Sequence, residues 1–400
     1  MKRITFIAAG VVLASVVAGF APAVPSWTES IAAASRGDSA CPQGTVTDAG
    51  LCVGTGDQAK RAAELTKTTF QTDALGAVIL GVWKDGKPLL VGALGDSQNG
   101  VPATVDMHHR TGNISSTVLT TVLLEQVDAH KLALSDKLSK WYPNLPDANE
   151  VTVQMLTNGT AGYNHYPSLD SFQQAFYANP FRRWNASDVI AYGVAGGPLF
   201  TPGTNYKFSD TSLLILSQVL EKATHQSMFQ LIKKGVLEPL GMTNTTPPTP
   251  ALPEPILHSY TNERGVWEDA TFWDPSWTGY VGGLGSNQDD IRRFIEAVGT
   301  GKLLSKASHQ AQLAPTTASL GTNTPKKYYA MGIAVVNGWL FTNPNLQGYS
   351  GAVGYLPSQK LTIVIYNTRT PRSNPDTPQA TQLFEGLSAI FSPNQQLQLG

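Results

Sequence analysis

The chain has 400 residues, of which 42% are hydrophobic and 14% charged, with 37 glycines and 26 prolines. This composition is typical of a globular, loop-rich protein and excludes an intrinsically disordered chain. The net charge of −1 argues against a nucleic-acid partner and against a strongly anionic membrane as partner.

The first residues have the pattern of a secretory signal peptide. A basic start, Met1–Arg3, precedes the apolar run Ile4–Phe20, and Ala21–Ala23 fits a small-x-small cleavage site. We therefore predict a signal peptide over residues 1–23 and a secreted, periplasmic or cell-envelope protein. The alternative is an uncleaved anchor, because the run is slightly long for a signal core and slightly short for a membrane span. No later segment is long enough to cross a bilayer.

Residues 24–58 are rich in Ala, Ser, Gly and Thr, and we interpret them as an N-terminal linker or ordered tail. The only two cysteines, Cys41 and Cys52, lie in this segment. In an oxidising compartment two such cysteines are expected to close a small disulfide loop, and the alternative is two unpaired thiols. A catalytic cysteine is not indicated, because no histidine lies near either one in the sequence.

The remaining chain alternates between strand-like and helical patterns. Asp85-Gly86 joins two β-rich apolar runs, which is a good signal for a β-hairpin. Apolar residues at helical spacing predict helices, and residues 128–210 carry short helical pieces and many turn residues. The predicted helices are 58–70, 114–127, 213–232, 289–298 and 378–390. The predicted strands are 77–83, 88–94, 329–336, 339–342 and 361–366.

This order predicts an α+β fold. An antiparallel sheet built from both chain ends would be flanked by helices and would carry an inserted helical subdomain. We expect one domain over 59–395, with its sheet part in 59–110 and 266–395 and its mainly helical part in 111–265. The seven histidines are scattered without metal-ligand spacing, so we predict no metal site and no cofactor.

Several motifs resemble those of one family. The segment His109–Thr117 resembles the F-R-x-G-S-x-x-K-T segment of serine β-lactamase-like proteins and D,D-carboxypeptidases, the penicillin-recognising serine hydrolases related to class C β-lactamases. Further segments agree with this family in order and spacing, and together they imply a β-lactamase/transpeptidase-like fold. These segments are Lys84–Lys87, Leu156–Gly162, Phe200–Gly203, Phe208–Asp210, Pro239–Thr245 and Tyr349–Gly351 with Gly354-Tyr355.

The first motif lacks the residues that react in the family. Asn113 stands at the place of the acylated serine, and an amide nitrogen conjugated to its carbonyl is a poor nucleophile. Ser116 stands at the place of the activating lysine, and a hydroxyl supplies neither a positive charge nor a base near neutral pH. No S-x-x-K occurs elsewhere in the chain.

The second and third motifs are altered as well. Phe208 replaces the family's tyrosine, which passes the proton, and Asp210 replaces the asparagine that holds the substrate amide. Asp210 is expected to be anionic at neutral pH and to repel a carboxylate-bearing ligand. Tyr349 replaces a histidine or lysine, so the usual contact with the substrate carboxylate has no cation, while Ser350 and Gly351 complete the third motif.

Backbone groups survive such substitutions. The resemblance implies an oxyanion hole made by the main-chain N–H groups of Asn113 and Ala352. Asn113 also fits the position of a helix N-cap, and a ligand contact is the alternative for its side chain. Tyr349 would either donate a hydrogen bond to a ligand or fill the space left by the missing polar groups.

Two serines remain as candidate substitute nucleophiles. Ser116 lies one helical turn from Asn113 on the same face, and Ser115 precedes it. Their only candidate bases are Asp210 and the pair His108-His109, which the fold would have to bring close.

Three functions follow from these observations. The first is a secreted protein that has lost serine acylation and binds a ligand, a peptidoglycan-derived peptide or another small molecule, in the old cleft; Asp210 favours a neutral or cationic ligand. The second is an active hydrolase (an esterase, D,D-peptidase or β-lactamase type) with a rearranged nucleophile such as Ser116. The third is a structural or interaction protein whose cleft is filled by its own side chains.

Overall fold

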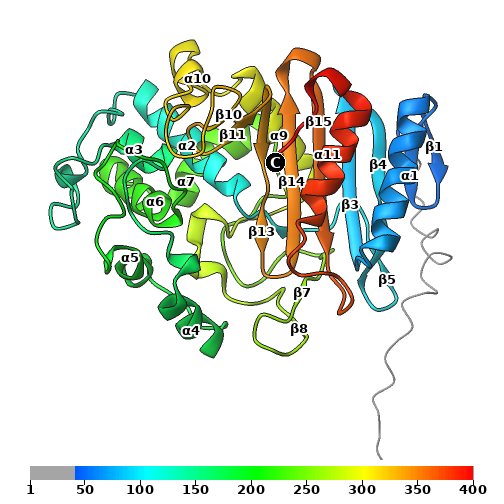
Figure 1. The fold of residues 1–400 in the computed structure, drawn as a ribbon, viewed down its shortest axis with the longest axis horizontal. Helices are drawn as coiled ribbons and strands as arrows, with labels where there is room; N and C mark the ends of the chain where they lie inside the picture. The colour runs from blue at the N-terminus through cyan, green and yellow to red at the C-terminus, as the bar shows by residue number, and fades with distance from the viewer. Residues whose placement is uncertain (1–40, 400) are drawn as a thin grey trace, which may run out of the picture.

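The computed structural model describes residues 41–399, so the predicted signal peptide over 1–23 lies outside the described residues. The described part is built around one eleven-stranded antiparallel sheet in the order β1-β2-β4-β3-β15-β14-β12-β11-β10 (Figure 1), with β5 on β4 and β13 on β14. The strands are β1 (Thr45–Asp48), β2 (Leu51–Gly54), β3 (Ala77–Lys84), β4 (Lys87–Gln98), β5 (Val101–Pro102), β10 (Lys327–Tyr329), β11 (Ala334–Val336), β12 (Trp339–Thr342), β13 (Asn345–Leu346), β14 (Tyr349–Leu356) and β15 (Leu361–Thr368).

Strands from the two chain ends meet at the centre of this sheet, as the sequence predicts. β3 pairs with β15 over their full length, from Ala77 opposite Thr368 to Lys84 opposite Leu361. The predicted hairpin is also confirmed, because Asp85 and Gly86 both have positive φ between β3 and β4, which the tight hairpin turns require.

Helices cover both faces of the sheet. Helices α1 (Asp57–Thr72) and α11 (Gln379–Phe391) pack side by side on one face (Figure 1). Helix α9 (Gln288–Thr300) covers the other face over β14 and β15. Because side chains alternate along a strand, Leu361, Ile363 and Ile365 pack toward α11, whereas Val364 and Tyr366 belong to the core on the α9 side.

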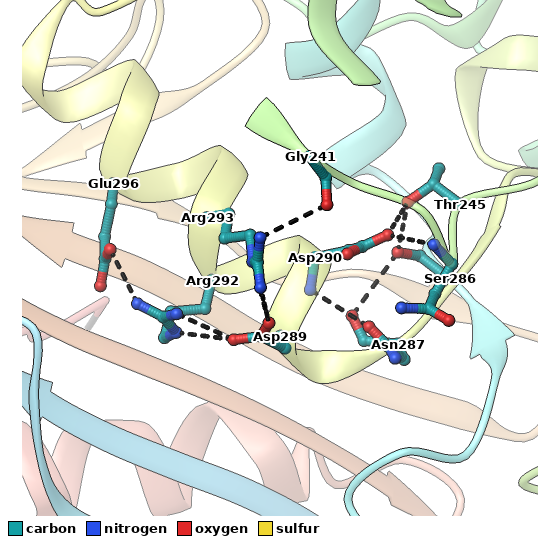
Figure 2. A network of polar contacts seen from close by, with 10 residues as sticks. Gly241, Thr245, Ser286, Asn287, Asp289, Asp290, Arg292, Arg293 and Glu296 are labelled. Carbon is teal, nitrogen blue, oxygen red and sulfur yellow. Dashed lines mark hydrogen bonds and ion pairs between the residues drawn. The ribbon is translucent and has the colours of Figure 1, made fainter. Parts of the chain in front are cut away.

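A polar network fixes the start of α9 (Figure 2). The Asn287 side chain accepts a hydrogen bond from the Asp290 N–H, and Asp290 Oδ2 accepts one from Thr245 Oγ1 at 2.9 Å. Thr245 Oγ1 also lies 2.8 Å from Ser286 Oγ. Ser286 belongs to β9 (Gly285–Ser286), which pairs with β6 (His109–Arg110). The network therefore anchors the short ribbon that carries the first family motif.

The helical part surrounds α2 (Ile114–Asp128), whose residues from Ile114 to Leu124 are all buried. Aromatic side chains of this part pack closely, and the Trp277 ring contacts those of Tyr166, Phe172 and Phe176. A second ribbon, β7 (Tyr260–Thr261) with β8 (Glu268–Asp269), completes the strands. The other helices are α3 (Val153–Asn158), α4 (Asp170–Ala178), α5 (Ala186–Val194), α6 (Asp210–Thr224), α7 (Met228–Ile232), α8 (Glu238–Leu240) and α10 (Lys306–Gln312), with a π-helical turn at Lys233–Leu237.

Of the two interpretations of 24–58, a linker or an ordered tail, the linker is wrong for the described part, which is ordered. Residues 45–54 form β1 and β2 at one edge of the sheet, and Leu51 and Val53 are buried there. The strands are short and β1 is largely polar, so their pattern is weak in the sequence. A disulfide joins Cys41 to Cys52, with Cα atoms 5.4 Å apart, and ties the entry to β1 onto β2.

Two predicted elements are each divided in the structure. The helix predicted over 213–232 stops at Thr224, because His225 adopts a left-handed conformation with φ 56°, and α7 starts from a capping box at Ser227. The strand predicted over 329–336 is interrupted between β10 and β11, where Gly332 has a φ of 71°. No helix of residues 41–399 is long and apolar enough to cross a membrane.

Candidate functional site: a filled motif cleft

The first motif starts on β6 and enters α2. Arg110 is buried, and its guanidinium donates hydrogen bonds to the carbonyl oxygens of Gly283, Thr249 and Pro250. Burial lowers the Arg110 pKa to about 10. Since all these acceptors are main-chain groups, the arginine of the motif holds loops together here and does not face a ligand.

Asn113 directly precedes α2 and is half-buried. Its backbone is helical, with φ −64° and ψ −9°, and its side chain accepts no hydrogen bond from the helix. A capping residue typically has an extended backbone, and its side chain accepts a hydrogen bond from an N–H of the first turn. The prediction that Asn113 caps the helix is therefore wrong. Its side-chain amide has no capping role at the position of the family's nucleophile.

The two candidate substitute nucleophiles are both fully buried. Ser116 Oγ donates a hydrogen bond to the Val281 carbonyl oxygen at 3.1 Å, and Ser115 Oγ lies 2.5 Å from Thr111 Oγ1. His108 and His109 instead face main-chain carbonyl groups, and burial lowers the His109 pKa to about 4. Neither serine therefore has the imidazole or carboxylate partner that an activated nucleophile requires.

The second motif begins the helix α6. Ser209 caps α6, since its side chain accepts a hydrogen bond from the Ser212 N–H. The half-buried Phe208 ring lies between His165 and Tyr329, with ring centroids 5.4 and 5.7 Å away. Phe208 therefore packs as an aromatic between the helical part and the sheet edge.

Asp210 is only 7% exposed, and its Oδ1 has no hydrogen-bond partner. Burial raises its pKa to about 7, so the expectation of a fully anionic Asp210 at neutral pH is wrong. His165 lies beside it, and Nδ1 accepts a hydrogen bond from the Asp210 N–H at 3.3 Å and is 3.9 Å from Oδ2. Burial lowers the His165 pKa to about 4, so the imidazole is neutral and does not pair with a carboxylate.

The sequence patterns do not single out His165. It follows the Leu156–Gly162 segment of the family pattern by three residues, and this position near a motif turn is the only signal that could point to it. Its proximity to Asp210 depends on tertiary packing alone.

The third motif lies on β14, and its first residue fills space. Tyr349 is 2% exposed, and its hydroxyl donates a hydrogen bond to the Leu257 carbonyl oxygen at 2.5 Å. Burial raises the Tyr349 pKa well above its usual range. Of the two roles open to Tyr349, the structure gives it the filling one. Ser350, Gly351 and Ala352 are also buried.

Pro344 closes the gap between the first and third motifs. Its carbonyl oxygen accepts a hydrogen bond from the Gly351 N–H at 2.6 Å. A Cβ placed on Gly112 would lie 2.6 Å from the Pro344 Cβ, and one on Gly351 would lie 3.0 Å from the Pro344 Cγ. The next two residues form β13, opposite Tyr349 and Ser350. The edge of β14 beside α2 is therefore occupied by the protein's own chain.

This arrangement does not assemble the predicted oxyanion hole. The Gly351 N–H points toward Pro344, and successive N–H groups of a strand point to opposite sides. The Ala352 N–H consequently faces β15, where Ile365 is the opposite residue. Ala352 cannot then donate to a ligand beside Asn113.

Two cavities open beside the motifs, and neither is lined by Asn113, Ser116, Asp210 or Tyr349. One of about 340 Å³ lies in the helical part, next to Phe208, and includes His165, Tyr206 and Lys207. The other, of about 240 Å³, lies between α4 and β13. Within residues 41–399 no group of three or more His, Cys, Asp or Glu residues could hold a metal ion.

The fold and the motif positions define a β-lactamase/transpeptidase-like protein. A family model described as Beta-lactamase matches residues 61–387, and the chain belongs to this family. A D-stereospecific amidohydrolase structure from Streptomyces sp. superposes with a TM-score of 0.71 and 22% identity, covering 82% of this chain and 98% of that one. This likeness concerns the fold.

Curated relatives match part of the chain. An uncharacterized Mycobacterium tuberculosis protein is 27% identical over 250 residues, which are 55% of this chain and 61% of the relative. Penicillin-binding protein 4* of Bacillus subtilis is 27% identical over 229 residues, 51% of this chain and 47% of the relative. The match thus spans less than two thirds of either relative's length.

Proposed function

We propose that this chain is an exported member of the β-lactamase family that has lost serine acylation and recognises a ligand without turning it over. One observation carries the loss of acylation: Pro344 occupies the edge of β14 next to Asn113, through its hydrogen bond with the Gly351 N–H. A substrate would have to displace this segment. It would then meet an amide where the family presents a nucleophile.

The chemistry of the site supports the same conclusion. Acylation requires a nucleophile with a base within hydrogen-bond reach, and Ser116 donates to a main-chain carbonyl group instead. An oxyanion hole alone leaves a residual acceleration of roughly 10³–10⁴-fold in a triad enzyme. Enzymes typically reach about 10⁶-fold or more. In this protein the second donor of the hole, the Ala352 N–H, faces β15 and not the site.

The setting of this function is proposed from the N-terminal pattern and the relatives. The signal-like start of the sequence supports a mature protein in the envelope or outside the cell. A relative named as a penicillin-binding protein makes peptidoglycan-derived peptides a natural ligand class. Because Pro344 and Tyr349 fill the motif cleft, the expectation of a ligand in that cleft does not hold, and we place recognition in the neighbouring cavities.

The test is turnover of an activated ester and of a chromogenic β-lactam by the purified protein. We expect rates that do not saturate with substrate and that are unchanged in the variants Ser115→Ala and Ser116→Ala. Saturable hydrolysis that disappears in one of these variants would establish the active-hydrolase alternative and overturn the proposal.

A further inference from the structure

A cavity of about 240 Å³ lies between elements of the helical part and of the sheet part, next to the filled motif cleft. Its apolar wall is formed by Phe172 and Phe176 of α4, by Trp277 and by Leu346 of β13. Drug-sized ligands occupy cavities of about 300–1,000 Å³. The size and the aromatic wall therefore fit a small molecule with one apolar group.

The cation of this cavity is Arg369, which directly follows β15. Its Nε is buried without a hydrogen-bond partner, and in the described part of the chain no carboxylate lies within ion-pair distance of its guanidinium. Glu263 and Asp376 act on it only from farther away. A partly buried arginine without a direct partner is costly, and a planar carboxylate would satisfy its N–H groups two at a time.

Two other residues that line the cavity carry buried N–H donors without acceptors. Gln347 is 8% exposed and lines the cavity, and its Nε2 has no hydrogen-bond partner. The indole Nε1 of Trp277 is likewise buried and unpartnered.

The cavity also has an acidic lining residue, Glu263. This residue lies in the loop between β7 and β8, and its carboxylate interacts with the hydroxyl groups of Thr261 and Tyr177 and, at longer range, with the charge of Arg369. A ligand with only a carboxylate would compete with Glu263 for Arg369. A ligand with both charges would satisfy both side chains.

We propose that this cavity binds a small zwitterion of the amino-acid type, with its carboxylate on Arg369, its ammonium group toward Glu263 and its apolar side chain against Phe172, Phe176 and Trp277. This assignment rests on the proposed recognition function and gives it a place and a ligand class. It requires no covalent step.

The test is direct binding of phenylalanine, in both enantiomers, to the full protein, followed by calorimetry and by the change in tryptophan fluorescence. We expect saturable binding of at least one enantiomer with a Kd on the order of 1 mM or lower. Two truncated probes control for the charges, since 3-phenylpropanoate lacks the ammonium group and 2-phenylethylamine lacks the carboxylate. Each should bind at least about tenfold more weakly.

Variants identify the site. Arg369→Gln should weaken phenylalanine binding at least about tenfold, whereas Arg372→Gln, an exposed arginine in the same loop, should leave it unchanged. Glu263→Gln should weaken binding of phenylalanine but not of 3-phenylpropanoate. Absence of saturable binding to the wild-type protein, or equal affinities of wild type and Arg369→Gln, would overturn the assignment. Either result would leave the loss of acylation standing, because that is read from turnover.

Discussion

The Pro344 carbonyl oxygen accepts a hydrogen bond from the Gly351 N–H at 2.6 Å, and this contact joins the chain before β13 to the third family motif. The same proline also packs against Gly112, one residue before the position of the family's nucleophile. The contact places the protein's own chain between the first and the third motif.

The packing of Pro344 predicts an unusually costly glycine substitution. Gly112 has a φ of 56° and no room for a Cβ beside Pro344. Gly112→Ala should lose about 1–2 kcal/mol from its left-handed backbone and about 1–3 kcal/mol more from overpacking, measured by urea denaturation.

Gly86→Ala is the matched control for this effect. Gly86 also has positive φ, at 73°, but a methyl group added there would have no other atom within 4 Å. It should therefore lose only the backbone contribution of about 1–2 kcal/mol. Equal losses for the two variants would contradict the close contact with Pro344. Pro344→Gly removes the Cβ that the added methyl group would meet and should relieve part of the Gly112→Ala loss.

We expect replacement of the buried Asp210 by a neutral residue to increase the free energy of unfolding, and the increase to depend on pH. Burial raises its folded-state pKa to about 7, well above the usual value of an aspartate carboxyl. The folded state thus binds more protons than the unfolded state, so this group makes stability fall as pH rises from about 4 to 7. Asp210→Asn should stabilise the protein on the order of 2–4 kcal/mol at about pH 8 and far less at about pH 4.

The comparison for Asp210 is Asp170→Asn. Asp170 also stands in the first turn of a helix, α4, but is exposed. Loss of its charge should cost about 0.3–1 kcal/mol through the helix dipole at neutral pH. The free energies of unfolding of both variants and of the wild type are measured at the two pH values. An Asp210→Asn variant that is no more stable than the wild type at high pH would refute the buried-carboxyl interpretation.

Ser116 should behave as a structural hydroxyl. Ser116→Ala removes its hydrogen bond to the Val281 carbonyl oxygen and should cost about 1–3 kcal/mol, because that acceptor is left buried. Ser116→Lys restores the family residue, but it places an ammonium at a fully buried position and should lower the thermal midpoint much further. A Ser116→Lys variant as stable as wild type would show that the site is open.

We expect the Cys41–Cys52 disulfide to stabilise the edge of the sheet formed by β1 and β2. The double variant Cys41→Ser, Cys52→Ser opens a loop with a sequence separation of 11 and should cost about 3 kcal/mol in the chain-entropy description. Hydrogen exchange should increase first in β1 and β2, with the centre of β3 protected. Uniform loss of protection across the sheet would contradict this local role.

The sheet could be predicted from the sequence because its signals are local. The Asp85-Gly86 turn sits between apolar runs, and the long apolar strands at the two chain ends carry enough buried residues to be recognised. β13 could not, because it has only two residues and directly follows Pro344, and proline usually argues against a strand.

The positions of the motif residues follow from the sequence, but their environments do not. The sequence does not reveal that Asp210 is buried, which raises its pKa to about 7. It also does not reveal the main-chain carbonyl groups to which Ser116 and Tyr349 donate hydrogen bonds. Long-range contacts decide these properties. His165 likewise reaches Asp210 through a separation of 45 residues.

The central claim is that no side chain of this protein forms an acyl-enzyme. Incubation with a fluorophosphonate probe and, separately, with a penicillin, followed by intact-mass and peptide mass spectrometry, tests it most directly. We predict the unmodified mass in both cases. A stoichiometric adduct on one serine, abolished when that serine is replaced by alanine, would contradict the account.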